Sequence, residues 1–256
     1  EIPLRLVGSE MCIRDRFMDI SSARYSGDME INCDYIGMLE DRGCGCFAVC
    51  DGSLSGLNGD KVSELVIDSV LSDFKNTSDI TRDTISGYFK NADEKLWELT
   101  HTSKNNGEEK TYEASAAVVL TDGNCVISGH LGNCRMYYLS ENYLQYITPD
   151  HSLAYLAHSK GEFRFPGIRK SSERRKLTAY LGADPMCGAE TIDPIAVRSG
   201  DAVLICTDGF WEKITERQVE KTLKRSKSSS EWLRKMIRIV KKNEPEDSYS
   251  AITIIF

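Results

Sequence analysis

The chain has 256 residues, of which 41% are hydrophobic and 28% are charged, and its formal net charge is −7. This composition excludes an intrinsically disordered chain, and the acidic balance argues against a dedicated nucleic-acid-binding protein, which is usually basic. The length allows one large domain or two small ones. No run of about 18 apolar residues occurs, so the sequence predicts no membrane-spanning helix and we expect neither a membrane nor a nucleic acid as a partner.

The nine cysteines are an odd number, and none of them forms a Cys-x-x-Cys pair. We interpret them as reduced, mostly buried thiols, which favours a cytoplasmic protein over a disulfide scaffold. Residues 1–16 follow neither a helical nor a strand period and do not form a signal peptide. They resemble translated sequencing-adapter read-through, so we interpret 1–16 as a non-native N-terminal extension and begin the fold at residue 17.

Apolar periodicity and turn residues predict the elements of the first half in chain order. Residues 47–50 form a short apolar run that ends in Asp51-Gly52, which predicts a buried strand entering a turn. Helices are predicted over 61–74 and 81–101, where apolar residues recur at helical spacing. A series of strands follows, with hairpin turns between them. These strands are predicted at 114–120, 125–128, 135–139 and 143–147.

The second half begins with a polar, basic segment, residues 151–175, which has helical stretches but no long apolar face. Residues 202–207 predict another buried strand that ends in Asp-Gly. Two helices, at about 215–227 and 230–243, and a terminal strand at 251–256 complete the pattern. Because strands and helices come in blocks rather than in alternation, the order predicts antiparallel sheets with helices packed outside, an α+β layered fold.

Three carboxylate positions stand at the ends of predicted strands. Asp51 and Asp208 each follow an apolar strand and precede a glycine, and Asp247 lies just before the last strand. A glycine lets the backbone turn sharply and brings its carbonyl close to whatever the carboxylate binds. Hard cations such as Mg²⁺ and Mn²⁺ prefer oxygen ligands of this kind. Each position alone is more often a plain turn, and the interpretation depends on their combination and order.

Seven short motifs in one order extend this pattern along the chain. They are Asn32-Cys33-Asp34, residues 47–52, Gly132-Asn133-Cys134-Arg135, residues 148–153, residues 176–182, residues 204–212 and Asp247-Ser248-Tyr249-Ser250. In this order and spacing they resemble the PPM-type (type-2C) metal-dependent serine/threonine protein phosphatases of the bacterial kind. The resemblance covers about residues 17–256, which it implies form a single phosphatase domain.

The resemblance implies a four-layer α/β/β/α sandwich, in which two antiparallel sheets are flanked by helices and two Mn²⁺ or Mg²⁺ ions lie between the sheet ends. It implies that Asp51 bridges both ions, that the Gly52 carbonyl contacts the second ion, and that Asp208 and Asp247 bind the first. Asp34 would hold a metal-bound water. The implied reaction is hydrolysis of phosphoserine or phosphothreonine by a metal-activated water. The implied partners are a phosphorylated protein substrate and a cognate serine/threonine kinase in signalling.

The sequence departs from the family pattern at the predicted site. Met29 stands where the family has the arginine that clamps the substrate phosphate, and Cys33 stands where it has a glutamate for the second metal. Asn133 replaces the aspartate that helps to hold a third metal, and Ser248 replaces an asparagine. Arg24, or an arginine of residues 164–175, is a candidate substitute for the missing clamp.

These departures leave three functional hypotheses. The first is an active metal-dependent phosphoprotein phosphatase, which the complete trio of aspartates favours. The second is a weakened or inactive phosphatase-like regulatory or binding module, which Met29 and Cys33 favour. The third is a small-molecule phosphohydrolase on the same scaffold, because a fold does not fix a substrate. Of the histidines, His151 is expected to order its loop, and His101, His130 and His158 show no metal-ligand spacing.

Overall fold

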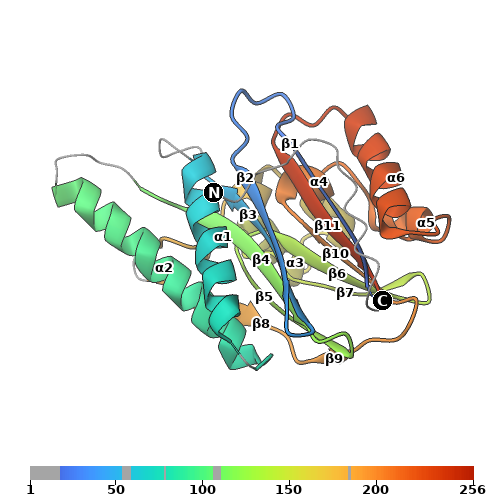
Figure 1. Ribbon diagram of the computed structural model, residues 1–256. Coiled ribbons are helices and arrows are strands. Elements are labelled where there is room, and N and C mark those ends of the chain that lie inside the picture. Colours follow the sequence, from blue (N-terminus) through green and yellow to red (C-terminus); the bar gives the residue numbers. More distant parts are fainter. Residues whose placement is uncertain (1–17, 54–58, 78, 106–110, 184–185) are drawn as a thin grey trace.

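The computed structural model describes residues 18–53, 59–77, 79–105, 111–183 and 186–256. The segment 1–16, interpreted above as a non-native extension, lies outside the described residues. Two antiparallel β-sheets are stacked face to face, and helices cover the outer face of each sheet (Figure 1). The predicted four-layer α+β sandwich is confirmed.

The first sheet has the strand order β1-β11-β10-β6-β7, and all of its pairs are antiparallel. Its strands are β1 (Asp19–Tyr25), β6 (Arg135–Ser140), β7 (Tyr143–Ile147), β10 (Ala202–Cys206) and β11 (Tyr249–Ile255). The second sheet has the order β2-β3-β4-β5-β8, and β9 also pairs with β5. Its strands are β2 (Asp34–Asp41), β3 (Cys44–Gly52), β4 (Ala114–Thr121), β5 (Cys125–Leu131), β8 (Glu190–Thr191) and β9 (Ile195–Ala196).

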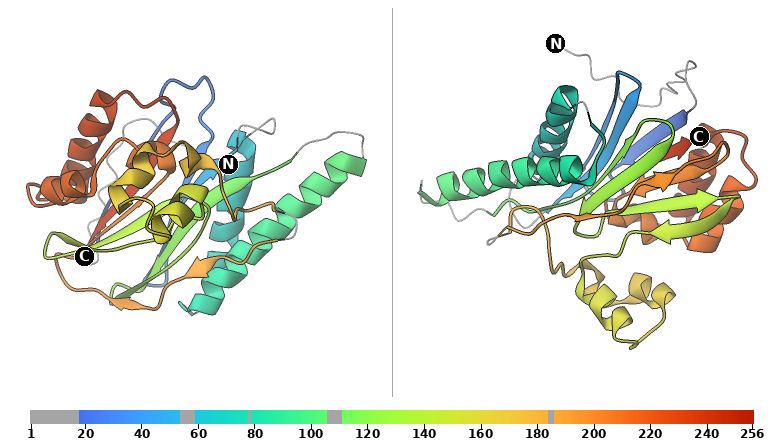
Figure 2. Two further views of the ribbon diagram at one scale, coloured as in Figure 1. Left: turned by 180° about the vertical axis from the view of Figure 1, so that it is seen from behind. Right: turned by 90° about the horizontal axis from the view of Figure 1, so that it is seen from below.

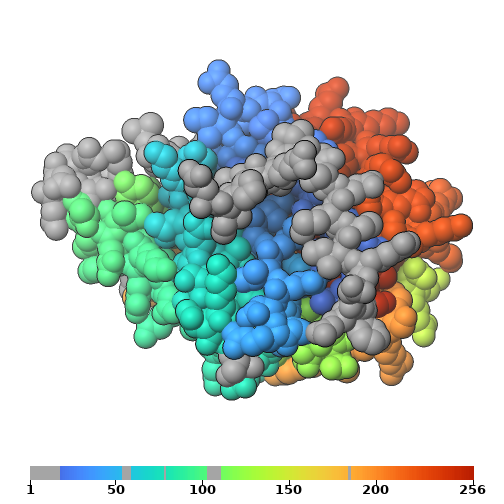
Figure 3. Space-filling view, viewed as in Figure 1, coloured from blue at the N-terminus to red at the C-terminus, as the bar shows by residue number. Residues whose placement is uncertain are grey.

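Helices α1 (Gly59–Asn76) and α2 (Arg82–Asn105) pack on the second sheet. Helices α4 (Asp208–Trp211), α5 (Glu216–Leu223) and α6 (Ser229–Lys242) pack on the first. The space-filling view shows the blue residues that begin the described part of the chain between α1 and α2 on one side and the red helices α5 and α6 on the other (Figure 3). No helix among the described residues is long and apolar enough to cross a membrane.

Side-chain alternation in the central strands divides the core into three layers. In β3, Cys46, Ala48 and Cys50 face the helices α1 and α2, whereas Phe47 and Val49 face the other sheet. This is the two-residue period of a strand that is buried on both faces. Strand β10 behaves in the same way, because its even-numbered residues face α4–α6 and its odd-numbered residues face the second sheet.

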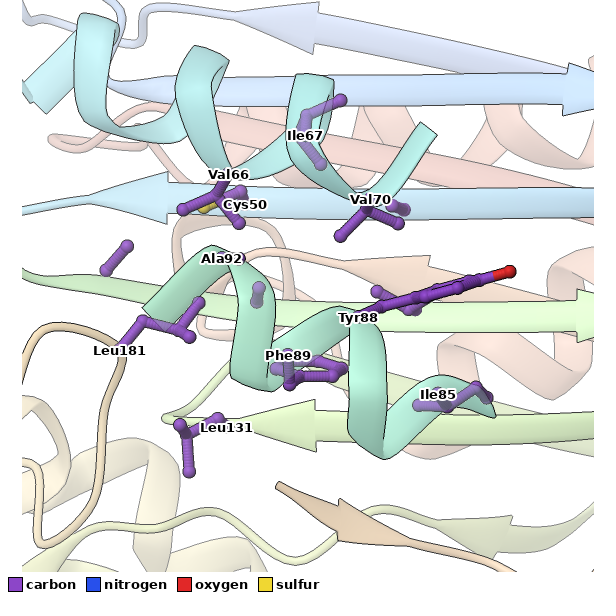
Figure 4. Packing of buried hydrophobic residues seen from close by; sticks show 14 of the residues in the cluster. Cys50, Val66, Ile67, Val70, Ile85, Tyr88, Phe89, Ala92, Leu131 and Leu181 are labelled. Atoms are coloured by element: carbon purple, nitrogen blue, oxygen red, sulfur yellow. The ribbon is translucent and has the colours of Figure 1, made fainter. Parts of the chain in front are cut away.

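The layer under α1 and α2 shows why the helical periodicity was visible in the sequence. Val66 and Val70 of α1 and Ile85, Phe89 and Ala92 of α2 lie on one face of their helices and are at most 2% exposed. These side chains point onto the strands of the second sheet (Figure 4). Burial of each valine, isoleucine and phenylalanine side chain contributes about 1.5–3 kcal/mol, which fixes both helices on the sheet.

Residues 153–175, called the flap below, form the short helices α3 (Leu153–Ser159), η1 (Phe165–Lys170) and η2 (Ser172–Arg175). The flap is drawn in yellow and projects from the body of the molecule (Figure 2). Its two ends are joined by antiparallel backbone hydrogen bonds, from Leu153 N to the Lys176 carbonyl at 2.9 Å and from Thr178 N to the His151 carbonyl at 2.8 Å. The flap therefore leaves the body and returns to it at one point.

A buried ion pair fixes the flap beside the first sheet. The Arg135 guanidinium donates to both oxygens of Asp150 at 2.6 Å, and both side chains are at most 2% exposed. The guanidinium carbon lies 3.5 Å from the centre of the Trp211 ring and 5.4 Å from that of Phe165 in the flap. A planar cation between aromatic rings thus links β6, α4 and the flap.

The predicted elements recur with shifted ends, and two differences are informative. Asp208-Gly209 opens the short helix α4 after Thr207, where the sequence predicted a turn. The sequence pattern did not predict the strands β1, β2, β8 and β9. Of these, β8 and β9 have only two residues each, which is too short for any periodicity to show.

Candidate active site

Four aspartates from four separate segments converge at one end of the two sheets. Asp34 begins β2 and is the register partner of Asp51 near the end of β3, Asp208 begins α4, and Asp247 precedes β11. A cavity of about 340 Å³ opens here. Its lining includes Asp51, Asp208 and Asp247, whereas Asp34 lies behind it and is fully buried. The structure thus brings together all four residues that the sequence selected.

Strand alternation places these side chains between the sheets. Asp51 continues the odd-numbered face of β3, which carries Phe47 and Val49 toward the other sheet. Thr207 continues the matching face of β10, and its hydroxyl donates to Asp34 Oδ2 at 2.8 Å. Polar groups therefore replace apolar ones where the layer between the sheets reaches its end, and that change creates the site.

Two glycines allow the segments of the site to approach closely. A Cβ on Gly209 would lie 2.0 Å from the Ser248 carbonyl oxygen, so only glycine brings the start of α4 this close to the Asp247-Ser248 backbone. A Cβ on Gly52 would lie 2.0 Å from the Gly59 carbonyl oxygen at the start of α1. The Asp-Gly pairs are thus explained by close backbone packing. The predicted turns are not found there, because Gly52 ends β3 and Gly209 lies within α4.

Asn133 holds Asp208 in place. Its side-chain amide donates to Asp208 Oδ2 at 3.0 Å, while its backbone carbonyl accepts from the Trp211 indole at 2.9 Å. In the sequence pattern, Asn133 stands where the family has an aspartate that helps to hold a third metal. The structure shows a neutral donor that stabilises an aspartate, a role that a carboxylate at this position could not fill without a proton.

The electrostatics of the site favour a bound cation. Burial, with the charges of Glu212 and Asp247, raises the pKa of Asp208 to about 7. Burial, with the charges of Asp208 and Asp247, raises the pKa of Asp34 to about 7. For Asp51, burial and the charges of the other three aspartates hold the pKa well above its ordinary value. Like charges are therefore crowded together, and the nearby charge of Arg175 offsets them only in part.

Asp208 Oδ1 adds a second indication, because it is buried and has no hydrogen-bond partner among the described residues. A buried carboxylate oxygen without a donor is costly, and a divalent cation would satisfy it. The oxygen donors of Asp51, Asp208 and Asp247 suit a hard cation such as Mn²⁺ or Mg²⁺. The residues present thus fit one metal position well.

The surroundings of the Gly52 carbonyl depart from an all-oxygen site. Cys33 lines the cavity beside Gly52 and is 4% exposed. Burial and the nearby charge of Asp51 raise the pKa of its thiol to about 11, so the group is a neutral thiol in this environment. A thiol is a weak partner for hard cations, and a second ion would here depend on Asp51 and the Gly52 carbonyl.

Two of the candidate substitutes for the phosphate clamp, Arg24 and Arg175, lie in different surroundings. The Arg24 guanidinium donates to the Asn32 carbonyl at 3.0 Å and lies over the Tyr35 ring, and neither Arg24 nor Met29 lines the cavity. Arg175, at the end of the flap, does line it. Among the described residues around the cavity, Arg175 is the one arginine or lysine.

A separate group, His130, His151 and Glu190, has ligand atoms within 4.8 Å of one another. Gly132 N donates to His151 Nδ1 at 3.1 Å, so the proton of this ring lies on Nε2, which faces Glu190 at 3.2 Å. His130 Nε2 lies 2.6 Å from the Pro149 carbonyl and carries the proton of its ring. Since the His151 nitrogens are both engaged, we interpret the group as an anchor for the loop that enters the flap, as expected for His151.

Ser115 is a site residue that the sequence analysis missed. Its hydroxyl oxygen accepts from the backbone N–H groups of Asn133 at 2.8 Å and Cys134 at 2.7 Å, and the residue also lines the cavity. It thereby fixes the loop that presents the Asn133 amide to Asp208. A lone hydroxyl in the apolar run of residues 114–120 was the available signal, because such a group must find a partner when it is buried.

Comparison with known proteins agrees with this geometry. Residues 25–251 match the family model "Protein phosphatase 2C", and the chain belongs to this family. A serine/threonine phosphatase Stp of Listeria welshimeri is 28% identical over 106 residues, which are 41% of this chain and 42% of that protein. This match thus spans less than half of the curated relative.

Solved structures show the same fold. The serine/threonine phosphatase Stp1 of Staphylococcus aureus superposes with a TM-score of 0.84 at 18% identity, over 98% of this chain and 99% of that one. The catalytic domain of the serine/threonine protein phosphatase PstP, in complex with 2 manganese ions, superposes with a TM-score of 0.78 at 15% identity. That match covers 93% of this chain and 97% of the PstP domain.

Proposed function

We propose that this chain is a metal-dependent phosphoprotein phosphatase that hydrolyses phosphoserine and phosphothreonine. The observation that carries the proposal is the convergence of Asp51, Asp208 and Asp247 on one cavity that also contains an arginine. Membership of the protein phosphatase 2C family supports it. The manganese bound by the structurally similar PstP domain supports Mn²⁺ as the ion, with Mg²⁺ as the alternative.

Each residue has a defined part in the proposed mechanism. Asp51, Asp208, Asp247 and the Gly52 carbonyl would hold the metal, which supplies a water of lowered pKa and charge compensation for the phosphoryl oxygens. Asp34, fixed by Thr207, would orient the attacking water through a hydrogen bond. The bond from the water oxygen to phosphorus forms as the phosphorus bond to the seryl or threonyl oxygen breaks. The leaving oxygen takes up a proton, and the products are an alcohol and inorganic phosphate.

The inactive regulatory module remains the second candidate, because Cys33 provides no carboxylate beside the Gly52 carbonyl. The discriminating experiment measures hydrolysis of a phosphoserine peptide and of p-nitrophenyl phosphate while Mn²⁺ is titrated. We expect turnover that depends on Mn²⁺ and disappears in Asp208→Ala, with Glu244→Ala, an exposed residue outside the cavity, as the control. Absence of metal-dependent turnover on both substrates would favour the regulatory module, and turnover on the small ester alone would favour a small-molecule phosphohydrolase.

The biological setting belongs to the same proposal. We propose a phosphorylated protein substrate, a cognate serine/threonine kinase and a role in signalling within a single domain over residues 17–256. A cytoplasmic location is supported by the eight free cysteines among the described residues, because thiols persist in reducing compartments. Recovery of a serine/threonine kinase or its phosphorylated targets on the Asp208→Ala variant, but not on a heat-denatured sample, would test this setting.

A further inference from the structure

The Arg175 guanidinium lies beside the aspartates and is held in a fixed orientation by Glu212. Arg175 Nε donates to Glu212 Oε1 at 3.1 Å, and Arg175 Nη2 donates to Glu212 Oε2 at 2.9 Å. The Glu212 side chain is 3% exposed, whereas that of Arg175 is 42% exposed. A bidentate contact with a buried carboxylate therefore anchors one edge of the guanidinium and leaves the other edge open to the cavity.

The open edge faces the aspartates. Arg175 Nη1 lies 3.1 Å from Asp247 Oδ2. A guanidinium has five N–H donors, and the contacts with Glu212 and Asp247 engage three of them, so one N–H on each terminal nitrogen remains. Two such donors on a planar group match the oxygens of a phosphate, which arginine binds in a bidentate manner.

Two carboxylates lie beside the Arg175 guanidinium. Glu212 is shared by Arg174 and Arg175, with Arg174 Nε at 2.6 Å from Glu212 Oε1. Asp247 also contacts Arg175, so the two arginines face two carboxylates, and Arg175 places its positive charge at the rim of an otherwise acidic cavity. A phosphate monoester that approaches the aspartates meets this charge as the one arginine or lysine among the described lining residues.

We propose that Arg175 is the substrate-binding residue that holds the phosphoryl group in this protein, with Glu212 as the residue that positions it. The position that normally supplies this contact is Met29, which offers no donor and does not line the cavity. The contact has thus moved from the segment before β2 to the end of the flap. The inference rests on the proposed phosphatase function and concerns how that site recognises phosphate.

The test measures binding of inorganic phosphate to the Mn²⁺-loaded protein by calorimetry, together with KM and kcat for a phosphoserine peptide. Arg175→Met should weaken phosphate binding and raise KM on the order of 10- to 100-fold, because charged hydrogen bonds are lost. Arg175→Lys should recover only part of the affinity, since lysine keeps the charge but not the paired donors. Arg174→Met is the matched control, because it removes an arginine from the same Glu212 but does not line the cavity, and phosphate affinity should stay within about twofold.

Manganese affinity, measured in a separate titration, distinguishes a phosphate contact from damage to the metal site. Unchanged phosphate binding in Arg175→Met would overturn the proposal, and so would an equal loss of phosphate and manganese binding. If the parent protein turns over substrate and Arg175→Met has the same KM, the proposed role of Arg175 is wrong and the phosphatase function stands. If the parent protein binds phosphate through Arg175 without turnover, the clamp stands and the phosphatase function is wrong.

Discussion

Gly209 sets the distance between two of the candidate metal ligands, and its replacement tests the geometry of the site directly. In Gly209→Ala the new Cβ would lie 2.0 Å from the Ser248 carbonyl oxygen and 3.4 Å from the Asp247 Cβ. Ordinary contact begins at 3.4 Å, so the two backbones must separate by about 1.4 Å. Because Gly209 does not have a positive φ, this separation is the main expected effect of the substitution.

The displacement is large on the scale of metal coordination, where ligand distances hold to about ±0.2 Å. We expect manganese affinity to fall on the order of 10-fold or more. Overpacking should also lower the free energy of unfolding by about 1–3 kcal/mol. Calorimetric titration with Mn²⁺ measures the first effect, and urea denaturation in EDTA measures the second.

Gly87→Ala provides the matched control for this experiment. Gly87 lies within α2, and a Cβ there meets nothing within 4 Å. This variant should gain about 0.5–1 kcal/mol of stability, since alanine favours a helix over glycine, and keep the parent manganese affinity. If Gly209→Ala also keeps the parent manganese affinity, the close approach of α4 to the Asp247 segment does not set the metal site, and the reasoning is refuted.

Two further predictions concern charge. Because the pKa values of Asp34 and Asp208 are raised to about 7 from an ordinary 3.8, the folded protein binds protons more tightly than the unfolded chain. In EDTA, Tm should therefore fall as the pH rises from about 4 to 7, and Mn²⁺ should reduce this dependence of Tm on pH. A Tm that rises with pH over this range would contradict the prediction. Arg135→Met leaves Asp150 as an uncompensated buried charge and should cost about 3–5 kcal/mol in urea denaturation, while Arg135→Met combined with Asp150→Leu should recover part of the loss. A cost below about 1 kcal/mol for the single variant would show that the pair does not hold the flap.

The layered fold was predictable because burial leaves a period in the sequence. Helices α1 and α2 each have one apolar face. The predicted range 61–74 falls within α1, and the range 81–101 begins one residue before α2 and otherwise falls within it. The strands β4 and β10 are apolar throughout or nearly so, which reflects burial on both faces. Block order, rather than any single element, indicated antiparallel sheets with helices outside.

The site was only partly predictable, because its contacts join residues that are remote in the sequence. Asp34 and Thr207 are 173 residues apart, and Asn133 and Asp208 are 75 apart. The aspartates could be selected because each stands in a motif at a strand end. No motif showed that Asn133 donates to Asp208, or that Arg175 rather than Arg24 reaches the cavity. Those facts depend on how the loops pack, which periodicity does not encode.

The closed root of the flap has a consequence for protein engineering. Because Ser152 and Leu177 pair as neighbouring bridge residues, the two ends of the insertion are already side by side. Exchange of residues 153–173 for a segment of another length then adds little to the free-energy cost of loop closure. Each doubling of the length of a flexible loop raises that cost by only about 0.6 kcal/mol. Arg174 and Arg175 lie outside this exchangeable stretch and stay attached to Glu212. The molecule thus separates a replaceable surface segment from the arginines and aspartates of the candidate site.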